Sequence, residues 1–347
     1  MDNLKKLGLS ALAGSLVAFS ANAGELSVSG GAKLSYTGAQ GNEDNSDTGN
    51  NFGMQRLVTM SGSGELDNGM SVSLVHTFAT STGAGSTSSI TIDMGSMGTL
   101  GYGQDSYQVG ISKIDDIIPT AEEEVSNGLS LTATESAGST AVNGNTYEVD
   151  LGGNGFNYTL NAGDMATIVV GWAPRGVDNL NDDGAMGGTD GDGSDSSVHV
   201  VLTPMDGLKV VAGTGERVNG NEMDDMETFG ATYTYGPVSA GIQVTEIDYE
   251  AANSGIARDA DTTYMGLAFN VNENFSISYT ESEETYDAQD DASTAVADVD
   301  QEIDAIQFAY SMGGMSVKAY QMDVTNPAFD EDADDSKVTE IALGLAF

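Results

Sequence analysis

Residues 340–347 read Glu-Ile-Ala-Leu-Gly-Leu-Ala-Phe, so that a large apolar side chain takes every second position. Successive side chains of a β-strand point to opposite faces. One face of this stretch therefore carries only large apolar residues, namely Ile341, Leu343, Leu345 and Phe347. The same alternation runs through residues 25–36, where one face carries Leu26, Val28, Ala32, Leu34 and Tyr36. A period of two predicts β-strands rather than helices.

Two kinds of connection interrupt this alternation along residues 24–347. Seven short turns rich in Gly, Asn and Asp lie at 67–69, 95–98, 161–164, 204–207, 236–237, 272–274 and 312–314. Eight longer polar loops lie near 39–50, 81–88, 105–144, 176–195, 219–225, 250–258, 285–301 and 325–336. The two kinds alternate strictly, so they join sixteen antiparallel strands that can close on themselves and leave no unpaired edge. We therefore expect an all-β fold, a 16-stranded antiparallel transmembrane β-barrel with short periplasmic turns and long extracellular loops.

The first 23 residues have a different pattern. Lys5 and Lys6 precede an uncharged apolar stretch over residues 7–19, and Ala21-Asn22-Ala23 supplies small residues for cleavage. This is the pattern of a secretory signal peptide, and the apolar run is too short to span a membrane as a helix. We expect residues 1–23 to be a cleaved signal peptide and residues 24–347 to form the barrel domain.

Composition excludes several classes of function. The 347 residues include 11 Lys and Arg against 53 Asp and Glu, for a formal net charge of −42, and no Cys. A nucleic-acid binder is excluded because phosphate recognition needs basic groups. Without Cys there are no disulfides, thiolate metal sites or thiol catalysis. Since charge on the lipid face is unfavourable, we expect the acidic excess in the loops and the lumen, where it would favour cations. Adaptation to a saline habitat is the alternative explanation.

Five local patterns carry a resemblance to a known family. The signal peptide runs directly into the first strand, and Gln55-Arg56-Leu57 opens the second. Residues 64–70 read Gly-Glu-Leu-Asp-Asn-Gly-Met, and residues 98–105 read Gly-Thr-Leu-Gly-Tyr-Gly-Gln-Asp. Together with the terminal Phe347, these patterns resemble the general porins of Gram-negative outer membranes.

The resemblance implies a location, a function and partners. Members of the family are trimeric sixteen-stranded barrels that pass small hydrophilic solutes and ions across the outer membrane. The chain is then a homotrimer surrounded by outer-membrane lipid and lipopolysaccharide. Its C-terminal strand, with Ile341, Leu343, Leu345 and Phe347, would be the signal read by the barrel-assembly machinery.

The resemblance also implies an inward-folded third loop that narrows the pore. Around Pro119 this loop carries the acidic residues Asp115, Asp116, Glu122, Glu123 and Glu124. Strand parity turns Lys33 and Lys318 toward the lumen, and the resemblance places Arg56 on the same wall. Bases opposite an acidic loop would create a transverse field at the constriction, which would select among solutes.

A calcium site is a separate hypothesis for the fourth loop. Asp190, Asp192 and Asp195 are spaced by Gly and Ser, as oxygen ligands in calcium loops are, but no Glu follows to close an EF-hand. A solvated acidic loop is the alternative. We expect no required cofactor, with Ca²⁺ or Mg²⁺ as an optional bridge between acidic loops or to lipopolysaccharide phosphates.

The sequence thus favours a diffusion channel with cation preference, and two alternatives stay open. One is a secreted or surface-attached acidic calcium-binding adhesin, and the other is a substrate-specific outer-membrane channel. An enzyme is not expected, because no Gly-x-Ser-x-Gly motif occurs and the two histidines, His76 and His199, lie in strand patterns.

Overall fold

The computed structural model describes residues 26–40, 51–80, 85–122, 149–151, 154–174, 193–219, 222–249, 258–288, 299–327 and 335–347. Within these ranges most residues are in strands. The strands are β1 (Ser27–Gln40), β2 (Phe52–Glu65), β3 (Ser71–Thr80), β4 (Gly85–Asp93), β5 (Thr99–Asp105), β6 (Gly155–Ala162), β7 (Ala166–Pro174), β8 (Ser194–Met205), β9 (Leu208–Asn219), β10 (Glu222–Tyr235), β11 (Val238–Asp248), β12 (Arg258–Asn272), β13 (Phe275–Ala288), β14 (Val299–Met312), β15 (Met315–Thr325) and β16 (Ser336–Ala346). Two short 3-10 helices are η2 (Gly95–Met97) and η3 (Gly110–Ile114). No helix in the described ranges is long and apolar enough to cross a membrane.

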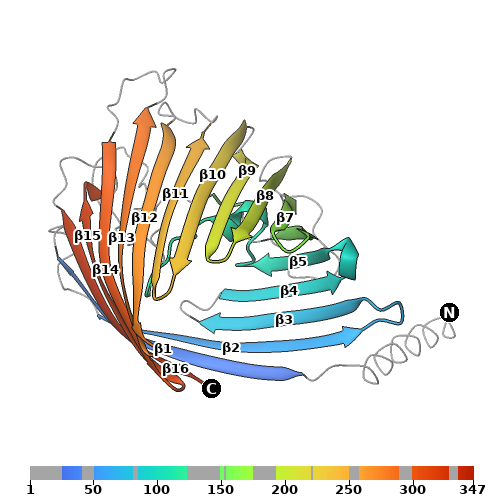
Figure 1. Cartoon of the computed structure of the whole chain (residues 1–347), viewed down its shortest axis with the longest axis horizontal. Coiled ribbons are helices and arrows are strands. Elements are labelled where there is room, and N and C mark those ends of the chain that lie inside the picture. The colour runs from blue at the N-terminus through green and yellow to red at the C-terminus, as the bar shows by residue number, and fades with distance from the viewer. Residues whose placement is uncertain are drawn as a thin grey trace, which may run out of the picture.

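The sixteen strands form one closed antiparallel barrel in which each strand pairs with its neighbours in sequence (Figure 1). The closure joins the two ends of the barrel domain, because β1 pairs with β16 and Leu34 lies opposite Leu343. Phe347 extends the closure by exchanging backbone hydrogen bonds with Gly30, at 2.8 and 3.0 Å. The predicted fold class is therefore confirmed, as are the seven short turns.

Local chemistry accounts for these turns. In the first of them Gly69 has a φ of +82°, a conformation that costs glycine little, and the Asn68 side chain accepts a hydrogen bond from the Met70 amide at 3.1 Å. At the turn between β12 and β13, Asn272 accepts from the amides of Asn274 and Phe275 at 2.9 and 3.1 Å. Side chains that bond their own backbone thus fix where each hairpin reverses.

The register divides each strand into outward and inward positions. Outward positions carry the exposed apolar residues, such as Leu34 and Ile341 beside the closure, which are 47% and 54% exposed. Aromatic rings meet on this face, and Tyr36 and Phe52 pack edge to face with centroids 5.2 Å apart. Inward positions carry polar, small or buried residues. An apolar exterior of this kind is what a barrel needs against lipid.

Acidic residues depart from the expected distribution. Many carboxylates lie on the outer face of β9–β15, in the half of each strand next to the long loops, rather than in the loops or the lumen. They are Glu216, Asp225, Glu227, Glu246, Asp248, Asp259, Asp261, Glu281, Glu283, Asp300, Glu302, Asp304 and Asp323. The expectation that the acidic excess lies only in loops and lumen is therefore wrong. These strands continue beyond their apolar band, so their outer ends tolerate charge.

Candidate functional site

A segment of the third loop, residues 106–122, lies inside the barrel. We call it the inner strap. It leaves β5, passes through η3 and packs against the inward faces of later strands (Figure 1). Val109, Ile111 and Ile114 are buried with Val211 of β9 and Met226 of β10. The predicted inward fold of the third loop is confirmed by this packing.

Inward polar side chains hold the strap along the wall, one strand after another. Asn157 of β6 accepts a hydrogen bond from the Gly110 amide at 2.6 Å, and Ser197 of β8 accepts from the Ile111 amide at 2.9 Å. Farther along, Gln243 of β11 accepts from Ile117 at 2.9 Å, and Ser278 of β13 accepts from Ala121 at 2.9 Å. Buried backbone amides need partners, and these side chains supply them. The strap therefore follows the wall from β6 to β13.

Gln243 is the most connected of these anchors. Its side chain is fully buried, and besides accepting from Ile117 it donates to the carbonyl oxygens of Ile114 and Asp115 at 2.7 and 2.9 Å. The same nitrogen lies 2.9 Å from Oγ1 of Thr228 on β10. One amide side chain thus satisfies three backbone groups of the strap, which sets the strap's height in the barrel.

Glycines on the inward positions make room for the strap. A Cβ at Gly230 would lie 2.8 Å from Cδ1 of Ile117, and one at Gly241 would lie 2.8 Å from Cδ of Pro119. In the strap itself, Gly110 has a φ of +55° and sits directly on Gly171 of β7. The strap can approach the wall this closely only where side chains are missing.

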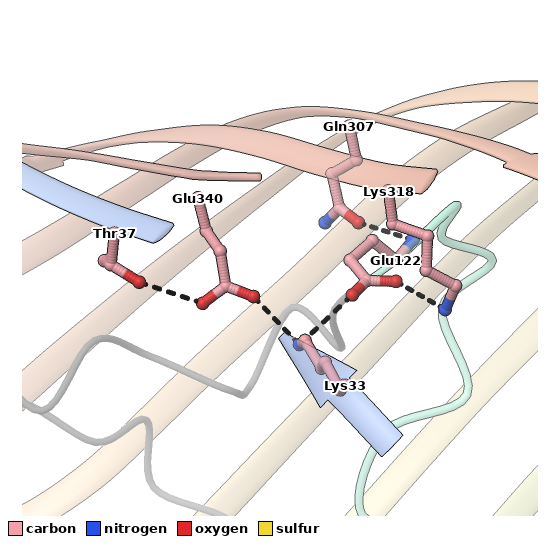
Figure 2. Close-up of polar contacts among 6 residues, drawn as sticks. All are labelled: Lys33, Thr37, Glu122, Gln307, Lys318 and Glu340. Atoms are coloured by element: carbon pink, nitrogen blue, oxygen red, sulfur yellow. Dashed lines mark hydrogen bonds and ion pairs between the residues drawn. The ribbon is translucent and has the colours of Figure 1, made fainter. Parts of the chain in front are cut away.

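Ion pairs hold the end of the strap, at Glu122, against the barrel wall (Figure 2). The carboxylate of Glu122, with a side chain only 4% exposed, lies 3.3 Å from Nζ of Lys33 and also contacts Nζ of Lys318. Its backbone amide donates to Gln307 of β14 at 2.9 Å. Lys33 also contacts Glu340 of β16 at 2.9 Å. Glu122 therefore joins the strap to β1, β14 and β15, beside the strand pair that closes the barrel.

The other predicted strap acids take different positions. Asp115 and Asp116 are half-buried, and the amide side chain of Gln108 reaches Asp115 at 3.5 Å. Asp116 is close enough to Lys209 of β9 for their charges to interact. Lys113 lies 5.5 Å from the centre of the Tyr107 ring, and desolvation lowers the pKa of its ammonium. Glu123 and Glu124 lie outside the described residues.

The structure places two of the three bases predicted for the wall, Lys33 and Lys318, on the inner face of the barrel, and their role at a constriction stays a prediction. Lys33 and Lys318 face the lumen and pair with Glu122, so they neutralise a strap acid by contact instead of facing it across a gap. Arg56 is a correction. It lies opposite Ala32 and alternates with exposed Met54 and Val58, so the register places it on the outer face. The turn and loop lengths before β2 set its register, and the resemblance had assigned the opposite face.

Of the three predicted calcium ligands, the structure describes only Asp195. Asp195 is buried in β8, where Oδ1 accepts a hydrogen bond from the Val218 amide at 2.8 Å. Asp190 and Asp192 lie outside the described residues, as do residues 1–23 and most of the long loops. The calcium site and the signal peptide stay predictions. In the part of the chain that the structure describes, no three His, Asp or Glu residues are grouped to hold a metal ion.

Acids and bases occur together in the described part of the lumen. Turn residues aside, its bases are Lys33, Lys113, Lys209, Arg217 and Lys318, and its acids are Asp115, Asp116, Glu122, Asp150, Asp195, Asp224, Glu284 and Glu340. Several are paired, as Arg217 is with Asp224 at 3.4 Å. Such a lining offers hydrogen-bonding and charged groups of both signs to a polar solute.

Sequence reasoning missed the side chains that anchor the strap. Asn157, Ser197, Gln243, Ser278 and Gln307 all occupy inward strand positions, which parity could have identified. Nothing in the pattern distinguishes them from other inward polar residues, because their role depends on where the strap passes. Lys209 was missed for the same reason.

Comparison with known proteins agrees with this architecture. The family model for Gram-negative porins matches residues 8–326. No curated protein sequence matches the chain. Similar solved structures include the anion-selective porin of Comamonas acidovorans, 12% identical with a TM-score of 0.65, over 93% of this chain and 99% of that one. OmpF of Salmonella typhi with daunomycin is 12% identical with a TM-score of 0.65, over 92% and 97%. The trimer form of OmpT of Vibrio cholerae is 12% identical with a TM-score of 0.63, over 94% and 100%. At this identity the structures bear on the fold alone.

Proposed function

The chain belongs to the Gram-negative porin family, and from this premise we propose that it passes small hydrophilic solutes and ions across the outer membrane by passive diffusion. The family and the fold make it an outer-membrane β-barrel channel. The path of the inner strap is the observation that carries the proposal. Because the strap follows the inner wall from β6 to β14, it occupies part of the lumen along that wall.

Cation preference belongs to the proposal as a property of the pore mouth. The described lumen carries acids and bases together, with Glu122 and Glu340 in contact with lysines. The strand ends next to the long loops carry acids almost without bases, as do the sequences of the loops themselves. Acidic mouths concentrate cations within about a Debye length, roughly 8 to 10 Å at ordinary ionic strength. The preference is therefore largest in dilute salt.

Export and assembly form a second part of the proposal. Residues 1–23 act as a cleaved signal peptide, and the C-terminal strand with Phe347 is the segment read by the barrel-assembly machinery.

The mature chain forms a homotrimer in contact with outer-membrane lipid and lipopolysaccharide. Polar side chains on the outer face of β2–β4 support an interface there, since His76 bonds Ser88 at 2.5 Å on a face that otherwise meets lipid. This bond also gives His76 a structural role, in keeping with a channel and not an enzyme.

A liposome-swelling experiment tests the diffusion proposal. Mature protein reconstituted in vesicles is diluted into isotonic solutions of sugars of increasing size, and the rate of swelling is followed by light scattering. The proposal expects rapid swelling with a pentose and a steady decline with solute size. A steep preference for one sugar out of line with its size would favour the substrate-specific channel. No swelling from a protein with full β-sheet circular dichroism would contradict the proposal.

A further inference from the structure

A hollow on the outer face of the barrel has no part in the proposed channel. It has a volume of about 810 Å³ and extends from β7 to β12. Most of its lining residues occupy outward positions, including the apolar residues Ile168, Val198, Val200, Phe229 and Val244. Ala212 lies among them, and its small side chain deepens the hollow. A volume of this size is typical of sites for small molecules.

One end of the same hollow is acidic. Glu227 lies directly opposite Glu246, and Glu246 lies directly opposite Asp261, so three carboxylates form a row across β10, β11 and β12. Directly opposed residues of antiparallel strands have Cβ atoms only about 4.5–5.5 Å apart, and like charges there destabilise the sheet. The bases of β8–β12 whose side chains the structure describes, Lys209 and Arg217, both occupy inward positions. The described outer face of these strands therefore supplies no lysine or arginine to the row.

We propose that this hollow binds a single amphiphile with a hydrocarbon tail and an ammonium headgroup. The apolar residues line the space that the tail would fill, and the row of carboxylates would surround the headgroup. An ammonium group has three donors for three acceptors. Its positive charge relieves the repulsion along the row, in a setting where nearby lipid strengthens electrostatic attraction. An anionic amphiphile would add to that repulsion, and a neutral one would leave it in place.

The single tryptophan of the chain allows a local readout. Trp172 is on the outer face of β7, and its cross-strand partner Ser196 is two residues from Val198 in the hollow. A reporter protein carrying Trp172→Phe and Phe229→Trp places the one indole in the hollow itself. Full-length mature protein in maltoside micelles is titrated with bromododecylammonium, bromododecanol and bromododecyl sulfate, whose bromine quenches tryptophan fluorescence on contact. We expect saturable quenching. The ammonium probe should reach half-maximal quenching at a concentration at least tenfold lower than the other two probes.

Variants separate the site from general partitioning into the micelle. Combining Glu227→Gln, Glu246→Gln and Asp261→Asn should abolish the preference for the ammonium probe. Combining Asp300→Asn, Glu302→Gln and Asp304→Asn removes the same charge from the outer face of β14, away from the hollow, and should leave it intact. Ala212→Phe should fill the hollow and weaken quenching by all three probes.

Three results would overturn the proposal. Equal quenching by the three probes would show partitioning into the micelle without a binding site. Equal loss of the ammonium preference in both triple variants would show a general effect of net charge. Quenching by the sulfate probe that requires Ca²⁺ would show a divalent cation bridge in place of an ammonium site. None of these measurements depends on conductance, so they test the binding site independently of the proposed channel function.

Discussion

Oε1 of Glu122, at the end of the inner strap, lies 3.3 Å from Nζ of Lys33 on the first strand of the barrel. Lys33 is on β1, one strand of the pair that closes the barrel, and it also contacts Glu340 on β16, the other strand of that pair. Glu122 therefore attaches the strap to the strand pair that closes the barrel. This arrangement links the width of the pore to the stability of the closure.

Glu122→Gln should shift ion selectivity toward anions. The substitution removes a negative charge that lies between Lys33 and Lys318 and leaves both ammonium groups facing the lumen. A unit charge at about 4 Å changes an ion's energy in water by roughly 1 kcal/mol, so the K⁺ to Cl⁻ permeability ratio should fall by up to about fivefold in dilute salt. Reversal potentials across a KCl gradient measure this ratio.

Asp300→Asn is the matched control for that experiment. It removes one negative charge from the outer face of β14 and leaves the strap contacts unchanged. Its reversal potential should move much less than that of Glu122→Gln. Equal shifts would mean that Glu122 acts only through the net charge of the protein.

Gln243→Leu should loosen the strap. The substitution leaves the Ile117 amide and the carbonyl oxygens of Ile114 and Asp115 without their side-chain partner. Each buried group left unsatisfied costs about 1–3 kcal/mol. We expect a lower temperature of barrel unfolding on heat-modifiability gels, together with noisier single-channel current. Thr77→Val, which removes the 2.9 Å bond between Thr59 and Thr77 far from the strap, should leave the current noise unchanged.

Two glycines at the contact between the strap and the wall should respond differently to alanine. Gly110→Ala places a Cβ on a backbone with a φ of +55° and against Ser197, so strain of about 1–2 kcal/mol adds to a clash. Gly230→Ala brings a Cβ within 2.8 Å of Cδ1 of Ile117, which is the end of a flexible side chain and can move, and within 3.1 Å of Cβ of Gln243, which must give by a few tenths of an ångström. Thermal unfolding should therefore show a clear loss for Gly110→Ala and a smaller one for Gly230→Ala. Equal losses would contradict the close approach of Gly110 to the wall.

Cation preference should weaken as salt rises. If the preference comes from acids at the strand ends and mouth, screening removes it when the Debye length falls from about 10 Å at 0.1 M to about 3 Å at 1 M salt. The permeability ratio measured at a fixed gradient should approach that of free diffusion at high salt. A ratio that stays constant would place the selective charges in direct contact with the permeating ions.

Much of the fold could be predicted from the sequence because a barrel repeats a simple pattern. Alternation of apolar and polar residues gives strand faces, and Gly, Asn and Asp mark turns such as that at Gly69. The face of Lys33 follows from the same parity. Arg56 was placed on the wrong face because its position came from a resemblance and not from the register, and a shift of one residue reverses the face.

The site was less predictable because it depends on contacts between distant segments. The acidic composition of the strap was visible, but not that Glu122 would meet two lysines. Likewise, inward Gln243 and Ser197 are ordinary strand residues until the strap passes over them. The distribution of acids was mispredicted because strands were assumed to end at the membrane, whereas β9–β15 extend their outward carboxylates beyond the apolar band.

Single-channel recording in planar bilayers tests the central claim most directly. Mature protein, shown to be β-rich by circular dichroism, is added to one side of the bilayer, and current is recorded before a KCl gradient is applied. The account predicts stepwise ohmic conductance, grouped in threes for a trimer, and a reversal potential that favours K⁺ in dilute salt. A folded protein that inserts into the bilayer and gives no conductance would contradict it.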